Sequence, residues 1–408
     1  MSIVINKQLK IPNEKPAKLQ VHQKYTDEIN SHKSQKEQNI PQNMNQPISQ
    51  KKPHNETSSK ISKTPQSCKD IFNNMDELKN FLKTNCKEFL EKFELLDFLK
   101  NGSAGSVIKA HPKIRGNKAP SNRLIALKFL YNGKNKKGNQ DHSEIYIHGA
   151  LKHKNIPPIF GYYKIGDNSC IAMEMCFYGD IENFKKNIIK RTSFSESLLL
   201  YITGGIVEAL HYIHTNYKII HMDIKPQNIL IDDYLMIKLT DFSVSINYKK
   251  NTDYIELPLW GTCYYMSPEV LGKQTILVEE ASKIDVYSLG VLLYYYAFCD
   301  YPYNLSSVNN KDYKQIEKNI QENSLEIPKD TGHSELFANF LKKCLNKNIK
   351  ERYNVYEIMD DPWYKGYKII LNEKEKLYNA GKFLIDLMVD NLLPLNEYIK
   401  GQEQQIMK

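Results

Sequence analysis

The spacing of apolar residues divides this 408-residue chain into a polar start, a long patterned middle and an amphipathic end. Residues 1–66 are rich in Lys, Gln, Asn, Ser and Pro and show no sustained apolar period. We expect a disordered tail there, because such a segment cannot bury enough surface to offset its chain entropy. Apolar residues then recur at helical spacing, which predicts a lead-in helix within residues 67–92, packed on the surface of a folded domain.

The last part of the chain, residues 365–408, has a second amphipathic pattern and is predicted to be a helical extension. Its apolar positions are Leu377, Phe383, Leu384, Leu387, Met388 and Leu392. Two interpretations are open at this point. The helix packs against the folded domain, or it is a regulatory helix that binds a partner.

Two polar runs in the middle of the chain carry the candidate chemistry. Residues 221–228 read His-Met-Asp-Ile-Lys-Pro-Gln-Asn, and residues 241–243 read Asp-Phe-Ser. The apolar segments between them, 229–231 and 236–239, are typical of short buried strands. Together the runs supply two carboxylates, an ammonium and an amide. Phosphoryl transfer needs such groups, because Mg²⁺ takes acid oxygens, the phosphate takes a cation and the attacking hydroxyl is oriented by a carboxylate.

Composition and charge narrow the class of protein. With 41% hydrophobic residues, 27 Tyr and 15 Phe, the chain can build the core of a packed enzyme. The formal net charge is +9, but residues 1–66 contain eleven Lys, no Arg and five acidic residues, so +6 of it lies in the predicted tail. A nucleic-acid enzyme usually carries its basic surface on the folded domain, and we therefore expect no nucleic-acid partner.

Cysteine usage and hydropathy indicate the cellular compartment. The seven Cys include no C-x-x-C pair, which is typical of reduced thiols rather than of disulfides or a zinc site. The N-terminus is too briefly apolar for a signal peptide, and Ser2 stands where myristoylation requires Gly. The longest apolar run, residues 289–299, is too short to span a membrane. We expect a soluble cytoplasmic or nuclear protein with no membrane partner.

The two polar runs resemble the catalytic loop, H-R-D-x-K-x-x-N, and the magnesium loop, D-F-G, of eukaryotic protein kinases of the Ser/Thr type. Further motifs of that family occur in the family's order within residues 93–364. They are a glycine-containing loop at 102–107, Ile-Ala-Leu-Lys at 125–128, a helix with its characteristic ending at 144–156, a hinge at 170–176, Gly-Thr-Cys-Tyr-Tyr-Met-Ser-Pro-Glu at 261–269 and Asp-Val-Tyr-Ser-Leu-Gly at 285–290. Arg352 is placed to form a buried bidentate ion pair with Glu269. The resemblance implies an α+β, bilobal protein kinase fold. The small N-terminal lobe is β-rich and includes the family's helix αC, and the large C-terminal lobe is mainly helical.

The resemblance also implies a role for each matching residue. The implied catalytic residues are Asp223, Lys225, Lys128, Glu144 and Thr262. The residues implied to bind ATP are Leu99, Gly102, Gly105, Val107, Ala126, Lys128, Glu174, Cys176, Asp180 and Leu230. Asn228 and Asp241 are implied to hold Mg²⁺. Protein substrates are the implied partners, and the reaction is transfer of the γ-phosphate of ATP to Ser or Thr hydroxyls.

Four positions depart from the family's pattern: Lys100 replaces the first Gly of the glycine-rich loop, His148 an apolar residue of the helix, Met222 the Arg of the catalytic loop and Ser243 the Gly of the magnesium loop. The Arg usually pairs with a phosphate on the activation loop. Met222 has no charge, so we expect an enzyme that needs no phosphorylation at Thr252 or Tyr254. His148 indicates looser packing of its helix. Ser243 restricts a loop flip by about 1 kcal/mol relative to Gly.

Two other functions fit parts of the pattern. A pseudokinase would use the same fold as a nucleotide-binding scaffold, and the four departures favour it, whereas the retained Lys128, Glu144, Asp223, Asn228 and Asp241 favour an active enzyme. A small-molecule kinase is disfavoured by residues 261–269, which build a peptide platform in the family. Tyrosine specificity also stays open, and the sequence does not identify the substrate.

Overall fold

The structure is a computed structural model. It describes residues 72, 74–102, 105–113, 123–130, 143–166, 168–189, 193–248, 253–329, 331–376, 383, 386–387 and 392–406. The predicted tail at 1–66 lies outside these residues, as do Thr252, Leu377, Leu384 and Met388. In the described part of the chain, no helix is long and apolar enough to cross a membrane.

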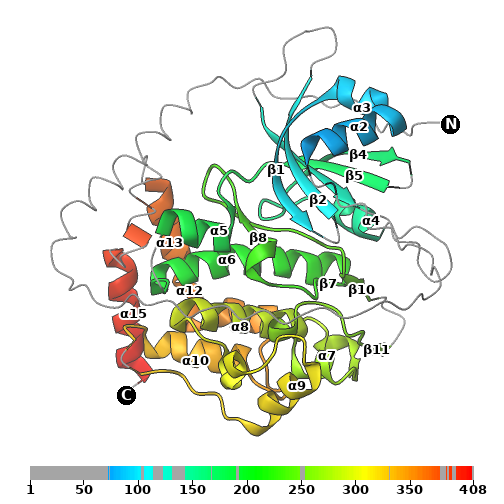
Figure 1. Cartoon of the computed structure of the whole chain (residues 1–408). Coiled ribbons are helices and arrows are strands. Elements are labelled where there is room, and N and C mark those ends of the chain that lie inside the picture. Colours follow the sequence, from blue (N-terminus) through cyan, green and yellow to red (C-terminus); the bar gives the residue numbers. More distant parts are fainter. Residues whose placement is uncertain are drawn as a thin grey trace, which may run out of the picture. The chain divides into compact units, whose positions relative to one another are not determined.

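An antiparallel sheet of five strands forms the N-terminal part of the fold (Figure 1). Its order is β1 (Phe93–Gly102), β2 (Gly105–Pro112), β3 (Ile125–Leu130), β5 (Asn168–Glu174) and β4 (Ile159–Ile165). Buried residues alternate along β2, so this strand has one face in the core. Helix α4 (Ser143–Ala150) follows β3 in the chain and contacts β4.

Two short helices precede the sheet and pack on it. They are α2 (Met75–Asn85), which begins at the N-cap Asn74, and α3 (Lys87–Lys92). The Asn74 side chain accepts a hydrogen bond from the backbone N–H of Glu77, which satisfies one free donor of the first turn. Leu78, Leu82 and Phe89 are buried in one cluster with apolar residues of β1, β2 and β3. The helices therefore extend the core of the N-terminal part.

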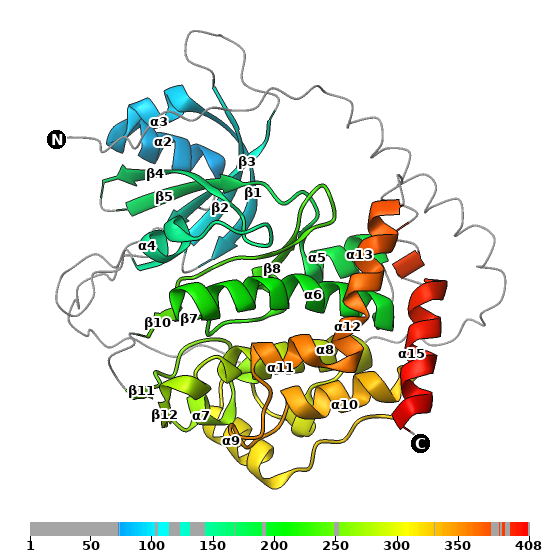
Figure 2. The same ribbon diagram turned by 180° about the vertical axis from the view of Figure 1, so that it is seen from behind.

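The rest of the fold is mainly helical (Figure 2). Its helices are α5 (Ile181–Phe184), α6 (Glu196–Tyr212), α7 (Pro268–Leu271), α8 (Lys283–Phe298), α9 (Tyr313–Glu322), α10 (Glu335–Cys344), α11 (Val355–Asp360), α12 (Pro362–Lys365), α13 (Tyr367–Lys376) and α15 (Leu393–Ile406). Short strands lie among them: β6 (Gly179–Asp180), β7 (Ile219–Ile220), β8 (Ile229–Ile231), β9 (Ile237–Leu239), β10 (Ile246–Asn247), β11 (Tyr254–Glu256) and β12 (Thr275–Leu277). This arrangement of a five-stranded sheet followed by a helical region confirms the predicted α+β, bilobal kinase fold.

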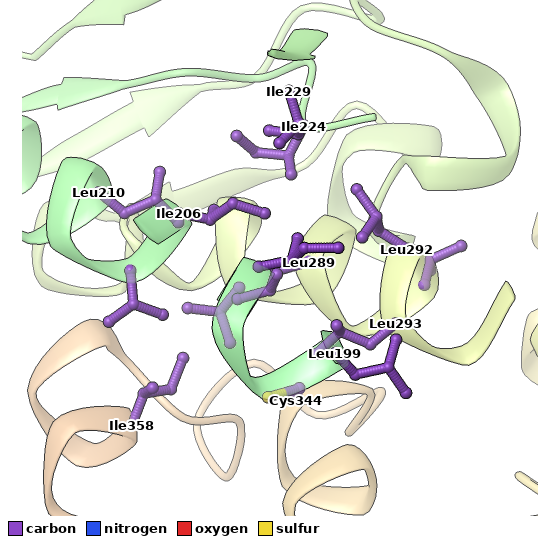
Figure 3. Close-up of a cluster of buried hydrophobic side chains, with 14 of the residues drawn as sticks. Leu199, Ile206, Leu210, Ile224, Ile229, Leu289, Leu292, Leu293, Cys344 and Ile358 are labelled. Carbon is purple, nitrogen blue, oxygen red and sulfur yellow. The ribbon is translucent and has the colours of Figure 1, made fainter. Parts of the chain in front are cut away.

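Helices α6 and α8 form the centre of the large core. Both are apolar on nearly all sides, as expected of helices buried by neighbours all around. Figure 3 shows Leu199, Ile206 and Leu210 of α6 beside Leu289 of α8, with Ile224 of the catalytic loop and Ile229 of β8 close by. Ile220, directly before the loop, is buried in the same core. The loop that carries the candidate chemistry is thus anchored in this core at both ends.

The C-terminal extension packs against α6. Phe383, Leu387 and Leu395 are buried in the same cluster as the α6 residues. The ring of Phe383 lies edge-on to that of Tyr201, with 5.4 Å between the centroids. The Lys374 ammonium of α13 donates a hydrogen bond of 2.6 Å to the Tyr201 hydroxyl. These contacts support packing on the large lobe, the first of the two interpretations of this segment.

Candidate active site

The catalytic loop is fixed by a buried carboxylate of α8. One oxygen of Asp285 accepts the backbone N–H of His221 at 2.8 Å, and the other accepts that of Met222 at 2.9 Å. Met222 has φ 71°, a left-handed conformation that costs energy for a side chain larger than Gly. Asp285 is fully buried, so these bonds are shielded from water. They hold the backbone of the loop in this strained conformation.

Asp223 lies at the centre of the next set of contacts. Its carboxylate accepts a hydrogen bond of 2.8 Å from the Thr262 hydroxyl and forms an ion pair of 2.7 Å with the Lys225 ammonium. Lys225 also donates to the Thr262 hydroxyl at 2.8 Å, so the three side chains close a triangle. The amide of Asn228 donates to the Asp223 carboxylate at 3.0 Å and to its backbone carbonyl at 2.8 Å. Each partner restricts the rotation of the carboxylate.

Gly261 brings Thr262 to the catalytic loop. Its φ is 111°, and a Cβ at this position would lie 2.5 Å from the carbonyl oxygen of Met222. Only Gly lets the two backbones approach this closely. The contact explains why Gly directly precedes the threonine that reaches Asp223.

A second cluster of charges joins the sheet, α4 and the magnesium loop. The Lys128 ammonium of β3 lies 2.5 Å from the Glu144 carboxylate of α4 and 2.8 Å from that of Asp241. Burial alone would raise the pKa of Asp241, but the charge and hydrogen bond of Lys128 and a hydrogen bond from Ser243 hold that pKa well below its usual range. Burial alone would lower the pKa of Lys128, but the two carboxylates raise it. The ammonium and Asp241 are therefore ionised at neutral pH.

Three rings pack at an angle to one another next to the charged groups. Phe242 lies between His148 of α4 and His221 of the catalytic loop, with centroid distances of 5.1 Å and 5.0 Å. Nε2 of His148 donates to the carbonyl oxygen of Pro157 at 2.8 Å, and the side chain is 1% exposed. Burial lowers the pKa of His148 to about 4, so the ring is neutral. Nδ1 of the same ring is buried and has no hydrogen-bond partner among the described residues, so the expected looser packing of this helix stays a prediction.

A further buried ion pair lies at Glu269, the last residue of the motif at 261–269. The guanidinium of Arg352 donates to both oxygens of Glu269, at 2.6 Å and 3.1 Å, and both residues are buried. The predicted bidentate ion pair is confirmed. The guanidinium also lies over the ring of Tyr287, 4.9 Å from its centroid, which is a cation–π contact.

The model of the family described as the protein kinase domain matches residues 93–364. The chain belongs to this family. Among curated relatives, the serine/threonine-protein kinase dst2 of Dictyostelium discoideum is 29% identical over 291 residues, 70% of this chain and 23% of the relative. Calcium-dependent protein kinase 5 of Plasmodium berghei (strain Anka) is 32% identical over 289 residues, 68% of this chain and 47% of the relative. The Aurora kinase of Schizosaccharomyces pombe is 29% identical over 280 residues, 68% of this chain and 72% of the relative.

The chain therefore spans less than a quarter of the first of these kinases and about half of the second. The family and its Ser/Thr relatives confirm the resemblance to protein kinases found in the sequence. The site residues belong to motifs that occur along this chain in the same order as in Ser/Thr protein kinases. The roles of individual residues rest on the geometry and remain proposals.

Several residues predicted to bind the nucleotide lie on neighbouring strands of the kinase sheet. Ala126 pairs with Met173 across β3 and β5, and Val107 packs against the same cluster. Cys176, two residues after the end of β5, is buried. Leu230 lies in β8, and its side chain is half-buried. At Gly105 a Cβ would lie 2.1 Å from the carbonyl oxygen of Phe129, so this position requires Gly. Leu99 is 44% exposed, and Gly102 ends β1.

Two of the residues predicted to bind the nucleotide have protein partners in this structure. The Asp180 carboxylate is the N-cap of α5, where it accepts the backbone N–H of Asn183 at 2.8 Å. The Glu174 carboxylate forms an ion pair of 2.7 Å with Lys238 of β9, which also lies 3.3 Å from Asp232. The backbone N–H of Glu174 donates to the carbonyl oxygen of Pro158 at 3.1 Å. Asp180 has to exchange its capping bond if it is to reach a ribose.

Sequence reasoning missed two positioning residues. The resemblance includes Asp285 in a family motif but implies no role for it. Asp285 is the single carboxylate of the mainly apolar helix α8, and a buried carboxylate needs hydrogen-bond partners, so its position in the sequence is a signal of such partners. No feature of the sequence indicates the ion pair of Lys238 with Glu174, because the two residues are 64 positions apart and only the fold brings them together.

Proposed function

We propose that this chain is an active protein kinase that transfers the γ-phosphate of ATP to Ser or Thr hydroxyls of protein substrates. The observation that carries the proposal is the simultaneous contact of Lys128 with Glu144 and Asp241. It ties β3 and α4 to the magnesium loop, the arrangement in which the nucleotide-binding and metal-binding groups converge. The pseudokinase alternative gives no physical reason for an intact cluster of this kind.

The triangle of Asp223, Lys225 and Thr262 supplies the transfer chemistry. Asp223 is the base that orients and accepts the proton of the attacking hydroxyl. Lys225 lies 2.7 Å from Asp223, where its charge neutralises the transferring phosphoryl group. Thr262 bonds both residues and belongs to the segment that resembles that of Ser/Thr kinases, which supports this substrate class.

The chemistry of the donors fits a bound Mg²⁺. Asp241 is ionised and Asn228 supplies an amide oxygen, both hard ligands of the kind that Mg²⁺ prefers alongside water and phosphate oxygens. These two residues would hold the ion, which would neutralise the charge of the nucleotide phosphates. Lys128, positioned by Glu144, would bind the same phosphates. Val107, Ala126, Met173 and Leu230 offer apolar surface to the adenine.

Phosphotransfer by the full chain tests this proposal. The assay uses Mg·ATP with a generic protein substrate, beside the variant Asp223→Asn as the matched control. We expect phosphate on Ser or Thr, and a loss of about a thousandfold in kcat for the variant, because general-base catalysis contributes about 10² to 10⁴. Binding of Mg·ATP without transfer by the wild-type protein would contradict the proposal and establish a scaffold.

The proposed kinase does not require a phosphate on its activation segment. The Met222 side chain is 4% exposed and packs in the large core, so it offers no cation to a phosphate. Treatment with a phosphatase is expected to change kcat less than twofold. Thr252→Ala and Tyr254→Phe are expected to be equally active. Loss of activity in all three cases would show that another cation reads the phosphate.

A further inference from the structure

A row of aromatic rings leads away from the proposed catalytic base. Tyr264 lies two residues after Thr262, whose hydroxyl is 2.8 Å from the Asp223 carboxylate. The ring centroid of Tyr264 is 4.6 Å from that of Tyr301, and the ring of Tyr301 stacks on that of Tyr295 at 4.9 Å. All three tyrosine side chains are half-buried, so the row is partly open to solvent.

The row ends at the ammonium of Lys185. This residue directly follows α5 and begins the π-helix η1 (Lys185–Ile189). Its nitrogen lies over three rings, 5.5 Å from the centroid of Tyr295, 5.2 Å from that of Tyr296 and 5.9 Å from that of Phe194. Attraction between the cation and the faces of these rings holds the ammonium in place.

The ammonium of Lys185 has no anionic partner in the described part of the chain. It forms no ion pair and no hydrogen bond with a described residue. It is not one of the fully buried polar atoms, and the side chain is half-buried, so solvent reaches the nitrogen. The next lysine differs, because Lys186 forms an ion pair of 3.5 Å with Glu182. Lys185 therefore has N–H donors and a charge to offer to a ligand.

The row of rings joins the two segments that flank Asp223. One is the segment of Thr262, and the other is the short helix η3 (Pro226–Asn228), whose last residue donates an amide N–H to the Asp223 carboxylate at 3.0 Å. Helix α5, directly before Lys185, contacts η3. A bound chain in extended form rises about 3.3 Å per residue. Residues a few positions from a hydroxyl held at Asp223 therefore reach the ammonium.

The carboxylates close to the row are already engaged. One oxygen of Glu182 accepts the Tyr296 hydroxyl at 2.9 Å, and the other pairs with Lys186. Asp300 accepts hydrogen bonds from the backbone N–H of Tyr301 and from the Ser306 hydroxyl. These acids have partners, whereas the ammonium of Lys185 has none. The charge that is left to attract a ligand is thus positive.

We propose that Lys185 selects protein substrates that carry Asp or Glu a few residues from the phosphorylated Ser or Thr. This role of Lys185 rests on the proposed function, since it names the substrate class of the same site. A carboxylate fits the position better than a phosphate dianion, because the charge of Glu182 on the neighbouring Tyr296 repels a dianion more strongly. A basic side chain is repelled by the ammonium itself.

A peptide library with a single Ser acceptor locates the selected position. Each flanking position in turn holds Glu, Gln or Lys, and the full chain with Mg·ATP phosphorylates the library at low ionic strength. Glu and Gln have nearly the same shape and differ in charge. At the selected position we expect kcat/KM to be about fivefold higher with Glu than with Gln, the effect of one partly exposed ion pair. Added salt is expected to reduce this ratio.

Substitutions of the two neighbouring lysines assign the selection to one of them. Lys185→Met keeps an aliphatic side chain over the rings but removes the charge, so the ratio of Glu to Gln is expected to fall to about one. Lys185→Glu is expected to reverse the selection, so that the Lys peptide is preferred to the Gln peptide. The matched control Lys186→Met removes an ammonium whose side chain is 66% exposed and is expected to keep the wild-type ratio.

Binding of the same library, with Ala in place of the acceptor, to the fluorescently labelled full chain separates this role from phosphotransfer. Tighter binding of the Glu peptide that is lost in Lys185→Met, without any transfer, would contradict the proposed function and support the role of Lys185. Equal use and equal binding of the Glu and Gln peptides at every position would overturn that role. A preference for Glu that survives in Lys185→Met would overturn it as well.

Discussion

At the scale of the single residue, the Thr262 hydroxyl joins the two charged side chains of the proposed transfer chemistry. It donates to Asp223 and accepts from Lys225, both at 2.8 Å. Without it, the carboxylate and the ammonium would still attract each other but would have more freedom to rotate. In the proposed mechanism, the hydroxyl therefore acts as a positioning group and does not itself react.

Replacing Thr262 separates the role of its hydroxyl from that of its shape. Thr262→Val keeps the shape and removes the hydroxyl, and kcat is expected to fall about tenfold to a hundredfold, the loss of a hydrogen bond to a charged group. Thr262→Ser restores the hydroxyl and is expected to stay within about threefold of the wild-type kcat. Steady-state assays at saturating ATP measure both. Equal kcat values for the Val and Ser variants would refute this role.

His148 links the three packed rings to the pH dependence of stability. Its pKa is about 4 in the folded protein, against the ordinary value of 6.5, so between these values the unfolded chain binds a proton that the folded chain does not. The free energy of unfolding therefore decreases as pH falls through this window. At pH 5 the decrease from this one group is about 2 kcal/mol.

Urea unfolding at pH 7.5 and pH 5 checks this effect against the variant His148→Leu. The variant is expected to lose about 2 kcal/mol less than the wild-type protein over that interval, although its stability at pH 7.5 is lower because the bond to Pro157 is gone. A matched control is Tyr146→Leu on the same helix, at a side chain that is 74% exposed, and its loss of stability is expected to follow the wild type. Parallel losses in all three proteins would show that His148 is not responsible.

At the scale of the element, the helices before and after the kinase domain extend its two cores. The apolar spacing predicted a single lead-in helix, but the structure divides it at Cys86, whose φ of −160° and ψ of 72° are not helical. Leu82 and Phe89 are both buried although they lie on different helices. Their spacing is compatible with one continuous helix, and so the sequence pattern has no mark of the break.

The C-terminal extension provides an element-level test of packing. Phe383 is 1% exposed against Tyr201 of α6, so Phe383→Ala is expected to reduce the free energy of unfolding by about 3 to 5 kcal/mol. The control Phe177→Ala removes a ring that is 46% exposed and is expected to change it by less than about 1 kcal/mol. Chemical denaturation measures both. A Phe383→Ala protein as stable as the control would mean that the extension does not contribute to the core.

At the scale of the whole molecule, the parts of the site that the sequence predicted are those that adjoin a patterned element. Lys128 lies within an apolar strand, Asp223 precedes one, and Gly261 fixes the turn that brings Thr262 to Asp223. What it could not predict depends on contacts between distant segments. The pairing of Glu174 with Lys238 joins residues 64 positions apart, which only the fold brings together, whereas the capping bond that Asp180 accepts from Asn183 is local.

The buried carboxylate of Asp285 has a consequence for how the protein responds to heat. Two amides of the catalytic loop are held by a helix that is buried along most of its length in the hydrophobic core. Loosening of α8 would lengthen these hydrogen bonds and change the geometry of the loop. For the proposed kinase, we therefore expect core substitutions next to α8 to lower phosphotransfer at temperatures below the unfolding transition.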